Sequence, residues 1–202
     1  MKRYPCLGIA CLMVGLAVLA ALGTDAAFAT TVPQMTVREM LAASSFVVYG
    51  RVESTTSRWN EDRTLIVTDV RIQVLDALKG GAGTEVVVTQ PGGRVGKLRV
   101  DVDGASGFLP GEEAVLFLAP GPGNETNVIG LSRGRFDVAT DAQSGRKTVR
   151  GLDAADLRTV RALRPSTAGA VTVPETGGPL DLDEFLGGIR HMAAEAGAKG
   201  GK

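Results

Sequence analysis

The chain is poor in the residue types that most often build reactive sites. Cys6 and Cys11 are its two cysteines, both lie within the first 29 of its 202 residues, and His191 is its single histidine. Beyond residue 29 the chain therefore forms no disulfide, no cysteine metal site and no cysteine nucleophile. A single histidine also leaves no His/Cys cluster for zinc. These shortages exclude much chemistry before any pattern is considered.

Residues 1–29 have the pattern of a secretory signal peptide. Lys2 and Arg3 form a basic end, residues 7–22 form an apolar run, and Ala27-Phe28-Ala29 places small residues at the cleavage positions. We expect cleavage after this triplet and export of the mature chain. The protein is then periplasmic or extracellular.

A lipoprotein signal that ends at Cys11 is a competing interpretation of the leader. Gly8 stands where a leucine is expected, however, and the apolar run continues past the cysteine. Farther along the chain, no segment reaches the ~18 consecutive apolar residues that a membrane span requires. We therefore expect a mature chain without a membrane span.

Cleavage leaves 173 residues, enough for one domain with a sizeable core and an appendage.

Charge gives no support for a polyanionic partner. The whole chain has 22 basic and 22 acidic residues, and loss of Lys2, Arg3 and Asp25 leaves a net charge of −1. Binding to nucleic acid or anionic lipid needs clustered Lys and Arg. We expect no nucleic-acid partner.

The middle of the chain has the composition of antiparallel strands. β-Branched and aromatic residues fill residues 46–52. From Thr64 to Leu75, apolar and polar residues alternate, which is typical of a strand with one buried face. The near-continuous apolar run 114–118 predicts a central strand covered on both faces. Further strands are expected at 86–88 and at 127–138, the latter with Gly130 and Gly134 as bulge or bend points, and residues 95–102 are expected to form a strand or a hairpin arm.

Five or six such strands are most economically closed into a small barrel, because closure removes exposed sheet edges. The sequence thus predicts a mainly β fold, a five- to six-stranded antiparallel OB-like barrel over residues 30–150. A two-sheet sandwich is the structural alternative. The turn-rich links between strands disfavour a parallel α/β fold.

Short helical patterns flank the predicted barrel. Thr36 and Glu39 form a capping box that starts a helix over residues 37–43. After the barrel, residues 151–202 are expected to form a helical appendage. It begins with a helix over residues 153–163, which Pro165 stops.

The end of the appendage contains a linker and a last helix. Residues 165–180 are rich in Pro, Gly, Ser and Thr, which indicates a linker. A helix is expected over residues 182–196, with Asp181 as its cap. Its apolar residues form one stripe and predict that the helix docks on another element: Leu182, Phe185, Leu186, Ile189 and Met192.

Three segments, taken in order, carry a family resemblance. They are Phe46–Val52, Val74–Gly80 and Pro110–Leu118. Together they resemble exported bacterial proteins with an OB-type barrel like that of the tissue inhibitor of metalloproteinases and the netrin module, across residues 36–138. The resemblance implies a barrel fold and suggests a secreted metalloprotease as a partner.

The inhibitory mechanism of that family does not carry over to this chain. Those inhibitors use an amino-terminal cysteine, tied by a disulfide, whose free amine chelates the zinc of the protease. The mature chain here would begin near Thr30 and has no cysteine. The resemblance therefore supplies a fold and a partner class without the inhibitory wedge.

Few residues are suited to catalysis. A serine hydrolase of the usual type needs a base beside its nucleophile, and His191 is expected on a solvent-facing helix. An acid/base pair of carboxyl groups needs one member shielded from water, whereas the acidic pairs here lie in turns or at element ends. The calcium-like pattern Asp101-x-Asp103 lacks the further ligand series of an EF-hand loop. We expect no catalytic residue, no cofactor and no bound metal.

The loop over residues 57–63 is the leading candidate for a binding surface. It contains the only tryptophan of the chain, and its candidate contact residues are Arg58, Trp59, Asn60 and Arg63. OB barrels commonly bind through the loop between their first two strands, and Trp and Arg are enriched in binding hot spots. The alternative interpretation is that the tryptophan folds back to cover an end of the barrel.

The turn over residues 90–94 is a second candidate surface, with Gln90 and Arg94 as its contact residues. Its Pro-Gly-Gly centre fits equally a rigid corner. The sequence therefore predicts an exported, non-enzymatic binding module, whose partner is a protein of the envelope or the medium. A glycan-binding envelope module, with Trp59 as the stacking platform, is the alternative, and an uncharacterised hydrolase is the third reading.

Overall fold

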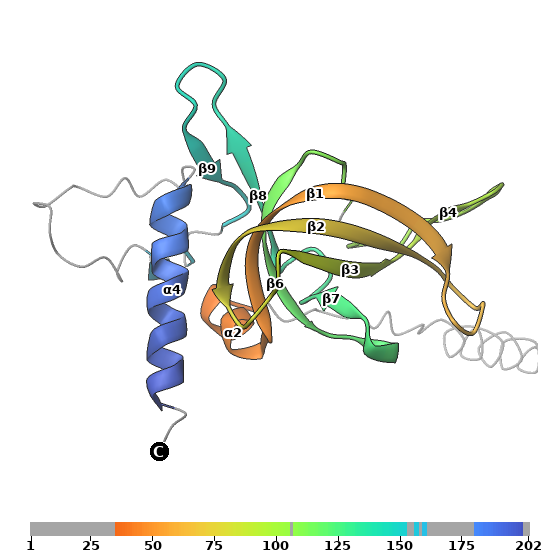
Figure 1. Ribbon diagram of the computed structural model, residues 1–202, viewed down its shortest axis with the longest axis horizontal. Coiled ribbons are helices and arrows are strands. Elements are labelled where there is room, and N and C mark those ends of the chain that lie inside the picture. The colour runs from red at the N-terminus through yellow and green to blue at the C-terminus, as the bar shows by residue number, and fades with distance from the viewer. Residues whose placement is uncertain (1–34, 106, 153–155, 158, 161–179, 200–202) are drawn as a thin grey trace, which may run out of the picture. The chain divides into compact units, whose positions relative to one another are not determined.

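The computed structural model describes the following residues (Figure 1): 35–105, 107–152, 156–157, 159–160 and 180–199. The predicted signal peptide, both cysteines and nearly all of the predicted linker lie outside this part of the chain. Of the helix expected over 153–163, the described residues 156, 157, 159 and 160 are helical. No helix among the described residues is long and apolar enough to cross a membrane.

Two 14-residue strands form the centre of the fold. β1 (Phe46–Trp59) and β2 (Ile66–Lys79) pair antiparallel from Val47–Lys79 to Trp59–Ile66, with three irregularities in the register. β3 (Glu85–Pro91) pairs with the other edge of β2. β6 (Glu113–Pro120) pairs with the first half of β1. Both long strands curve strongly along their length (Figure 1).

Short strands complete the sheet. β7 (Thr126–Val128) follows a 3-10 turn over Pro122–Asn124 and pairs with β6. β8 (Arg135–Thr140) also pairs with β6, and β9 (Lys147–Val149) pairs with β8. β10 (Leu180–Asp181) extends this edge. The order of the sheet is β10-β9-β8-β6-β1-β2-β3, with β7 beside β6, and β4 and β5 form a separate hairpin.

The described strands confirm a mainly β, antiparallel fold but not the predicted closed barrel of five or six strands. There are ten described strands, and β3 and β10 are the two ends of the sheet order. β7 lies against β3 without a backbone ladder. A side chain bridges them instead, since the Asn127 amide donates from Nδ2 to the Thr89 carbonyl oxygen at 2.8 Å. β7 has only three residues, which is too short for a strand ladder that would close the sheet against β3.

The strand expected over residues 127–138 is wrong, because a turn divides it into β7 and β8. Gly130 and Leu131 both have φ of 61°, which is left-handed backbone and incompatible with a strand. Gly130 was expected to mark a bend. Nothing in the side chain of Leu131 favours this conformation, so two consecutive residues of this kind could not be predicted from the sequence.

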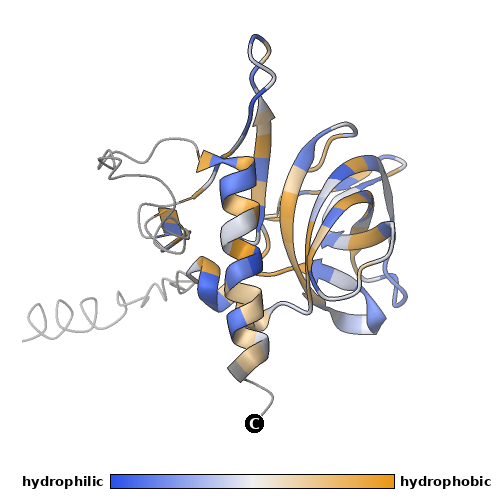
Figure 2. Cartoon of the chain, turned by 60° about the vertical axis from the view of Figure 1, so that its left-hand side comes forward, coloured by the Kyte–Doolittle hydropathy of each residue, from blue (hydrophilic) through white to orange (hydrophobic). Residues whose placement is uncertain are grey.

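The sheet separates two hydrophobic clusters. The inner cluster lies within the curve of the sheet and has the following buried members: Val48, Val52, Val70, Ile72, Val88, Phe108, Ala114, Leu116, Leu118 and Val128. The outer cluster lies on the opposite face and includes Val47, Val115, Phe117, Phe136 and residues of the helices. Successive residues of β6 alternate between the two clusters, which confirms a central strand covered on both faces. Figure 2 shows hydrophobic and hydrophilic residues alternating along several strands of the sheet.

Two helices cover the outer cluster. α2 (Val37–Ala43) begins with the predicted capping box of Thr36 and Glu39, and Lys79 donates to the carbonyl of Leu41 at its end. α4 (Leu182–Lys199) begins as expected, where the backbone N–H of Asp183 donates to Asp181. All five residues of its predicted apolar stripe are buried in the outer cluster, so the helix docks as predicted. These helices leave the far end of β1 and β2 uncovered by helix (Figure 1).

Candidate functional site

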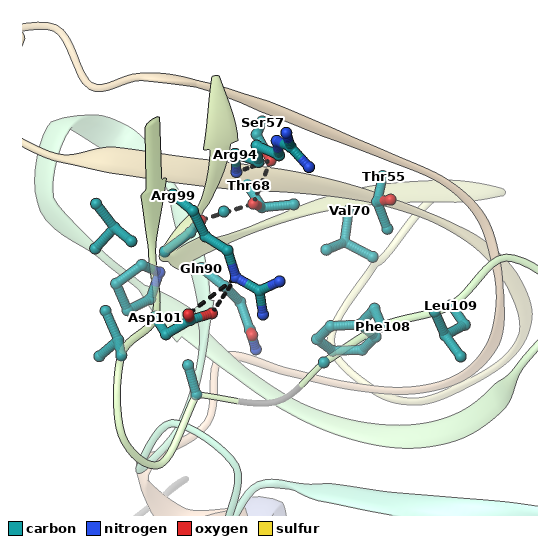
Figure 3. Close-up of a pocket in the computed structure, with 17 residues that line it drawn as sticks. Thr55, Ser57, Thr68, Val70, Gln90, Arg94, Arg99, Asp101, Phe108 and Leu109 are labelled. Carbon is teal, nitrogen blue, oxygen red and sulfur yellow. Dashed lines mark hydrogen bonds and ion pairs between the residues drawn. The ribbon is translucent and has the colours of Figure 1, made fainter. Parts of the chain in front are cut away.

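A cavity of about 630 Å³ lies at the end of the curved sheet that the helices do not cover. Its floor comes from β1, β2 and β3. Its cover comes from the hairpin of β4 (Gly93–Val95) and β5 (Leu98–Val100) together with residues 101–102, 105 and 107–109 (Figure 3). Val70 and Phe108 belong both to the lining and to the inner cluster. The pocket is therefore an open continuation of the core.

Two hydroxyl groups fasten the β4–β5 hairpin to the long strands. Thr68 Oγ1 donates to the Gly92 carbonyl at 2.7 Å, and the backbone N–H of Arg94 donates to Ser57 Oγ at 3.1 Å. Gly93 has φ of 135°, and a Cβ at this position would overlap the hydroxyl oxygens of Thr68 and Ser57. Glycine is required here because the backbone of the hairpin lies directly on these side chains.

Arg135 holds the opposite wall of the pocket in place. Its guanidinium carbon lies 4.3 Å from the centre of the Phe108 ring, and its Nη1 donates to the carbonyl of Gly107. Glu112 and Asp137 accept hydrogen bonds from the same guanidinium at 3.0 and 2.6 Å. The side chain of Arg135 is only 8% exposed. A buried arginine satisfied in this way fixes Phe108 against the sheet.

Gln90 carries an unsatisfied polar atom in this pocket. The residue is 5% exposed, and its Oε1 is buried with no hydrogen-bond partner among the described residues. A buried acceptor without a donor costs about 1–3 kcal/mol. Natural structures seldom keep such an atom unless a ligand, ion or water completes it.

Two arginines are cross-strand neighbours in the hairpin that covers the pocket. Arg94 and Arg99 are directly opposite in the β4–β5 register, so they share one face, and both line the cavity. Asp101 accepts from Arg99 Nε with both carboxylate oxygens, at 2.9 Å each. Arg94 donates from Nε to the carbonyl of Gly96 and has no carboxylate partner among the described residues. The pair therefore keeps an excess positive charge at the rim.

The lining as a whole offers donors, one open acceptor and apolar surface. Thr55 adds a hydroxyl group from β1, while Val70, Phe108 and Leu109 add apolar surface. Figure 3 shows Gln90, Arg99 and Phe108 around the same hollow. Its volume lies within the range of known small-ligand sites, which combine an apolar lining with a few placed polar groups. The arrangement is suited to hold an amphiphilic ligand with a negative charge.

The residues predicted to bind lie in different environments, and only some of them line the pocket. Gln90 and Arg94 both line the pocket, and the glycines between them make the tight corner that was the alternative interpretation. Trp59 follows Ser57 by two residues on β1, in a part of the strand with regular register, so it falls on the same face as the pocket lining. It is 37% exposed. Trp59 therefore stands at the open end of the sheet, beside the pocket.

Arg58 and Asn60 have structural partners. Arg58 donates to both carboxylate oxygens of Asp69, at 2.6 and 3.1 Å, and to Glu125 at 3.1 Å. The hydrogen bonds that Arg58 donates to Asp69 and Glu125 raise its pKa above the ordinary value. Asn60 accepts from the backbone N–H groups of Thr64 and Leu65, which closes the β1–β2 turn. Both side chains are therefore held by internal hydrogen bonds and are poorly placed to bind a partner.

Arg63 is the remaining candidate of the β1–β2 turn. It is exposed and has φ of 55°, so its backbone supports the turn while its side chain faces solvent. The sequence did not point to Thr55, Arg99 and Phe108 of the lining, or to Arg135 behind the Phe108 ring. A lone arginine in a strand or a lone phenylalanine in a loop gives no signal of a site, because the folding that brings them together is a tertiary feature.

A second polar cluster lies on the helix-covered side and is centred on Glu113. Its carboxylate accepts from Lys147 Nζ at 2.6 Å, from Arg51 Nη2 at 2.7 Å and from the Tyr49 hydroxyl. Burial alone would raise the pKa of Glu113, but these three hydrogen bonds outweigh it and lower the pKa to about 2. Burial and the hydrogen bond to Glu113 raise the pKa of Tyr49. The cluster is saturated with internal bonds and ties β9 to β1 and β6.

His191 and the adjacent acids Glu112 and Glu113 have partners among the described residues. His191 Nδ1 lies 3.6 Å from Glu195 on the exposed side of α4. Glu112 bonds to Arg135 and to the backbone of Leu109, whereas its neighbour Glu113 belongs to the separate cluster. The part of the chain that the structure describes contains no group of three or more His, Cys, Asp or Glu residues able to hold a metal.

The chain matches no protein-family model and no curated protein.

Proposed function

We propose that this protein is an exported, non-enzymatic binding module, and that its partner is another protein of the cell envelope or the medium. The observation that carries the proposal is the buried, unpartnered Oε1 of Gln90 inside a cavity of about 630 Å³. A preformed cavity with an unmet polar group is the usual state of a binding site without its ligand. Export is supported by the leader pattern of residues 1–29.

Binding explains the lining better than catalysis does. The one carboxylate of the lining, Asp101, is occupied by Arg99, and the hydroxyls of Ser57 and Thr68 bond to each other at 3.0 Å. A nucleophile needs a base within hydrogen-bond reach, and these hydroxyls have none. The lining therefore has recognition groups without a set that makes or breaks bonds.

The fold we propose for this module is an OB-type barrel closed by the contact of β7 with β3. It is supported by the pairing of β1 with both β2 and β6 and by the hydrogen bond from Asn127 to Thr89. OB barrels bind on this face and through the adjoining loops. A secreted metalloprotease is the partner class that the family resemblance suggests. It would be bound without the amino-terminal cysteine whose amine chelates the protease zinc in that family.

The test is retention of a partner by the protein and loss of that partner in a pocket variant. The protein would be immobilised and exposed to envelope extract and culture supernatant from its own cells. We expect one stoichiometric protein on the wild type and none on the double variant Gln90→Met/Arg94→Gln. Arg150→Gln is the matched control, because Arg150 is exposed on the β9 side and has no carboxylate partner among the described residues. Equal retention by all three proteins would contradict the proposed site.

Glycan binding is the second candidate function, and the exposure of Trp59 favours it. An exposed aromatic ring on the same strand face as the hydroxyl groups of Thr55 and Ser57 is able to stack on a sugar. Retention on isolated cell-wall glycan that is lost in Trp59→Ala would support this candidate over a protein partner. A hydrolase activity that survives purification would contradict both.

A further inference from the structure

The positive rim of the pocket indicates the charge of the bound group. Arg94 and Arg99 present two guanidinium groups on one face of a two-stranded hairpin, where like charges in opposite positions are destabilising. Asp101 neutralises only one of them. Guanidinium groups bind planar carboxylates with paired hydrogen bonds. A carboxylate between the two arginines would relieve the repulsion. It could accept hydrogen bonds from their Nη groups, because the contacts of Arg94 with Gly96 and of Arg99 with Asp101 use only Nε.

The buried acceptor of Gln90 indicates a donor on the same ligand. Its Oε1 has no partner among the described residues, so a ligand N–H or O–H that reaches it recovers the cost of its desolvation. Arg99, Asp101 and Gln90 line one cavity (Figure 3). The donor must therefore belong to a group only a few bonds away from the carboxylate.

The apolar part of the lining indicates the third component. Val70, Val100 and Phe108 line the cavity, and Arg135 fixes the ring of Phe108 from behind. An apolar side chain placed there leaves water and extends the inner cluster, which is favourable in proportion to the area buried. A purely ionic ligand would leave this surface unused.

We propose that the pocket binds the C-terminal end of a polypeptide whose last residue is apolar. A terminal residue is the simplest unit in which a carboxylate, an amide N–H and an apolar side chain all branch from one carbon atom. Arg94 and Arg99 bind the carboxylate, Gln90 accepts from the amide N–H, and Phe108 contacts the side chain. The preceding residues leave the pocket along β1 toward Trp59. This inference rests on the proposed function and specifies which part of the partner protein is bound.

Peptide titrations test the proposal directly. The probes are acetyl-Gly-Ala-Leu with a free carboxylate, the same peptide with a C-terminal amide, and acetyl-Leu-Ala-Asp-Ala-amide, whose carboxylate is an internal side chain. Affinity would be measured by calorimetry with the full chain, at low and high salt. We expect the free acid to bind, and the amide to bind at least tenfold more weakly. Affinity of the free acid should fall as salt rises.

Three variants separate recognition from folding. Gln90→Met removes the unpartnered oxygen at similar volume, so it should weaken the free acid about tenfold while the melting temperature stays equal or rises. Arg99→Gln should weaken binding more than Arg94→Gln, because it leaves Asp101 unneutralised beside the ligand carboxylate. Arg150→Gln should bind like the wild type.

Each outcome decides the proposal. Equal affinity for the acid and the amide, tighter binding of the internal aspartate peptide, or no binding of any probe at millimolar concentration would overturn it. A Gln90→Met protein with wild-type affinity would also overturn it. If the probes fail but the immobilised protein still retains a partner that the double variant loses, the C-terminus inference falls and the proposed function stands. If that retention is also absent, both fall.

Discussion

Glu113 shows how a single buried carboxylate is stabilised by its neighbours. Lys147, Arg51 and Tyr49 all donate to it, and the result is a pKa of about 2. A carboxyl group whose pKa is lower in the folded than in the unfolded chain stabilises the fold above its unfolded pKa. That contribution is lost as pH falls from about 4.5 toward 2.

The first prediction is that Glu113→Gln lowers the free energy of unfolding at pH 7 by about 1–3 kcal/mol, because charged donors lose their acceptor. The variant should also lose part of the decline in stability between pH 4.5 and 2 that the wild type shows. Urea unfolding across this pH range measures both effects. Glu61→Gln, at an exposed acid in the β1–β2 turn, is the control and should retain the wild-type decline.

Leu131 adopts a backbone conformation that suits another residue type. Its φ of 61° places a leucine in left-handed backbone, which costs about 1–2 kcal/mol for a residue with Cβ. Asparagine tolerates this conformation. The second prediction is therefore that Leu131→Asn raises the free energy of unfolding by about 0.5–1 kcal/mol in denaturant titrations. Leu98→Asn, at another exposed leucine that lacks a positive φ, should give no gain.

At the scale of elements, the β4–β5 hairpin is positioned by the corner at residues 92–93. The third prediction is that Gly93→Ala displaces this hairpin, since the new Cβ overlaps the hydroxyl oxygens of Ser57 and Thr68. We expect a loss of stability of about 1–3 kcal/mol by overpacking and at least a tenfold loss of affinity for the free-acid peptide. Unchanged affinity would mean that the hairpin does not shape the site.

Gly96→Ala is the matched control for this variant. Gly96 also has a positive φ, of 60°, but a Cβ there meets no atom within 4 Å. The control carries the strain of a residue with Cβ in left-handed backbone, about 1–2 kcal/mol, and lacks the overlap. Peptide affinity should therefore fall in Gly93→Ala and stay near the wild-type value in Gly96→Ala.

Elements with a strong local pattern were predictable from sequence. The capping box of Thr36 and the apolar stripe of the last helix each follow from spacing within a few residues, and both are present. β9 and β10 were not predicted, because each has only two or three residues and exists through pairing between Leu180 and Val149. Pairing between residues so far apart in sequence leaves no local periodicity to detect.

The candidate site was only partly predictable for the same reason. Gln90 and Arg94 stood out because a Pro-Gly-Gly corner separates them, and both line the pocket. The burial of Gln90 and the pairing of Arg94 with Arg99 depend on how the hairpin folds over the sheet. Arg58 was attractive by composition alone, whereas its charge is used by Asp69 and Glu125.

At the scale of the whole described domain, the helix-covered outer cluster and the candidate pocket lie on opposite faces of one sheet. Phe185 is fully buried on α4, and its ring lies 5.4 Å from that of Phe136 in the outer cluster. Phe108 lies across the sheet in the inner cluster and lines the pocket. The two aromatic residues therefore allow stability and recognition to be tested separately.

The fourth prediction compares these two truncations. Phe185→Ala should lower the free energy of unfolding by about 3–5 kcal/mol, because it leaves a cavity in the outer cluster. Its affinity for the free-acid peptide, measured where the variant remains folded, should equal that of the wild type. Phe108→Ala should lower affinity at least tenfold. Loss of affinity in Phe185→Ala would show that the clusters are coupled.

The separation of the two clusters has a consequence for how such a protein diversifies. Because the helices and β6 maintain the fold from one side and Gly93 anchors the hairpin, the exposed hairpin residues Lys97, Leu98 and Arg99 can be exchanged with little thermodynamic penalty. New ligand preferences would then arise through substitutions in this short segment, while the rest of the domain stays unchanged.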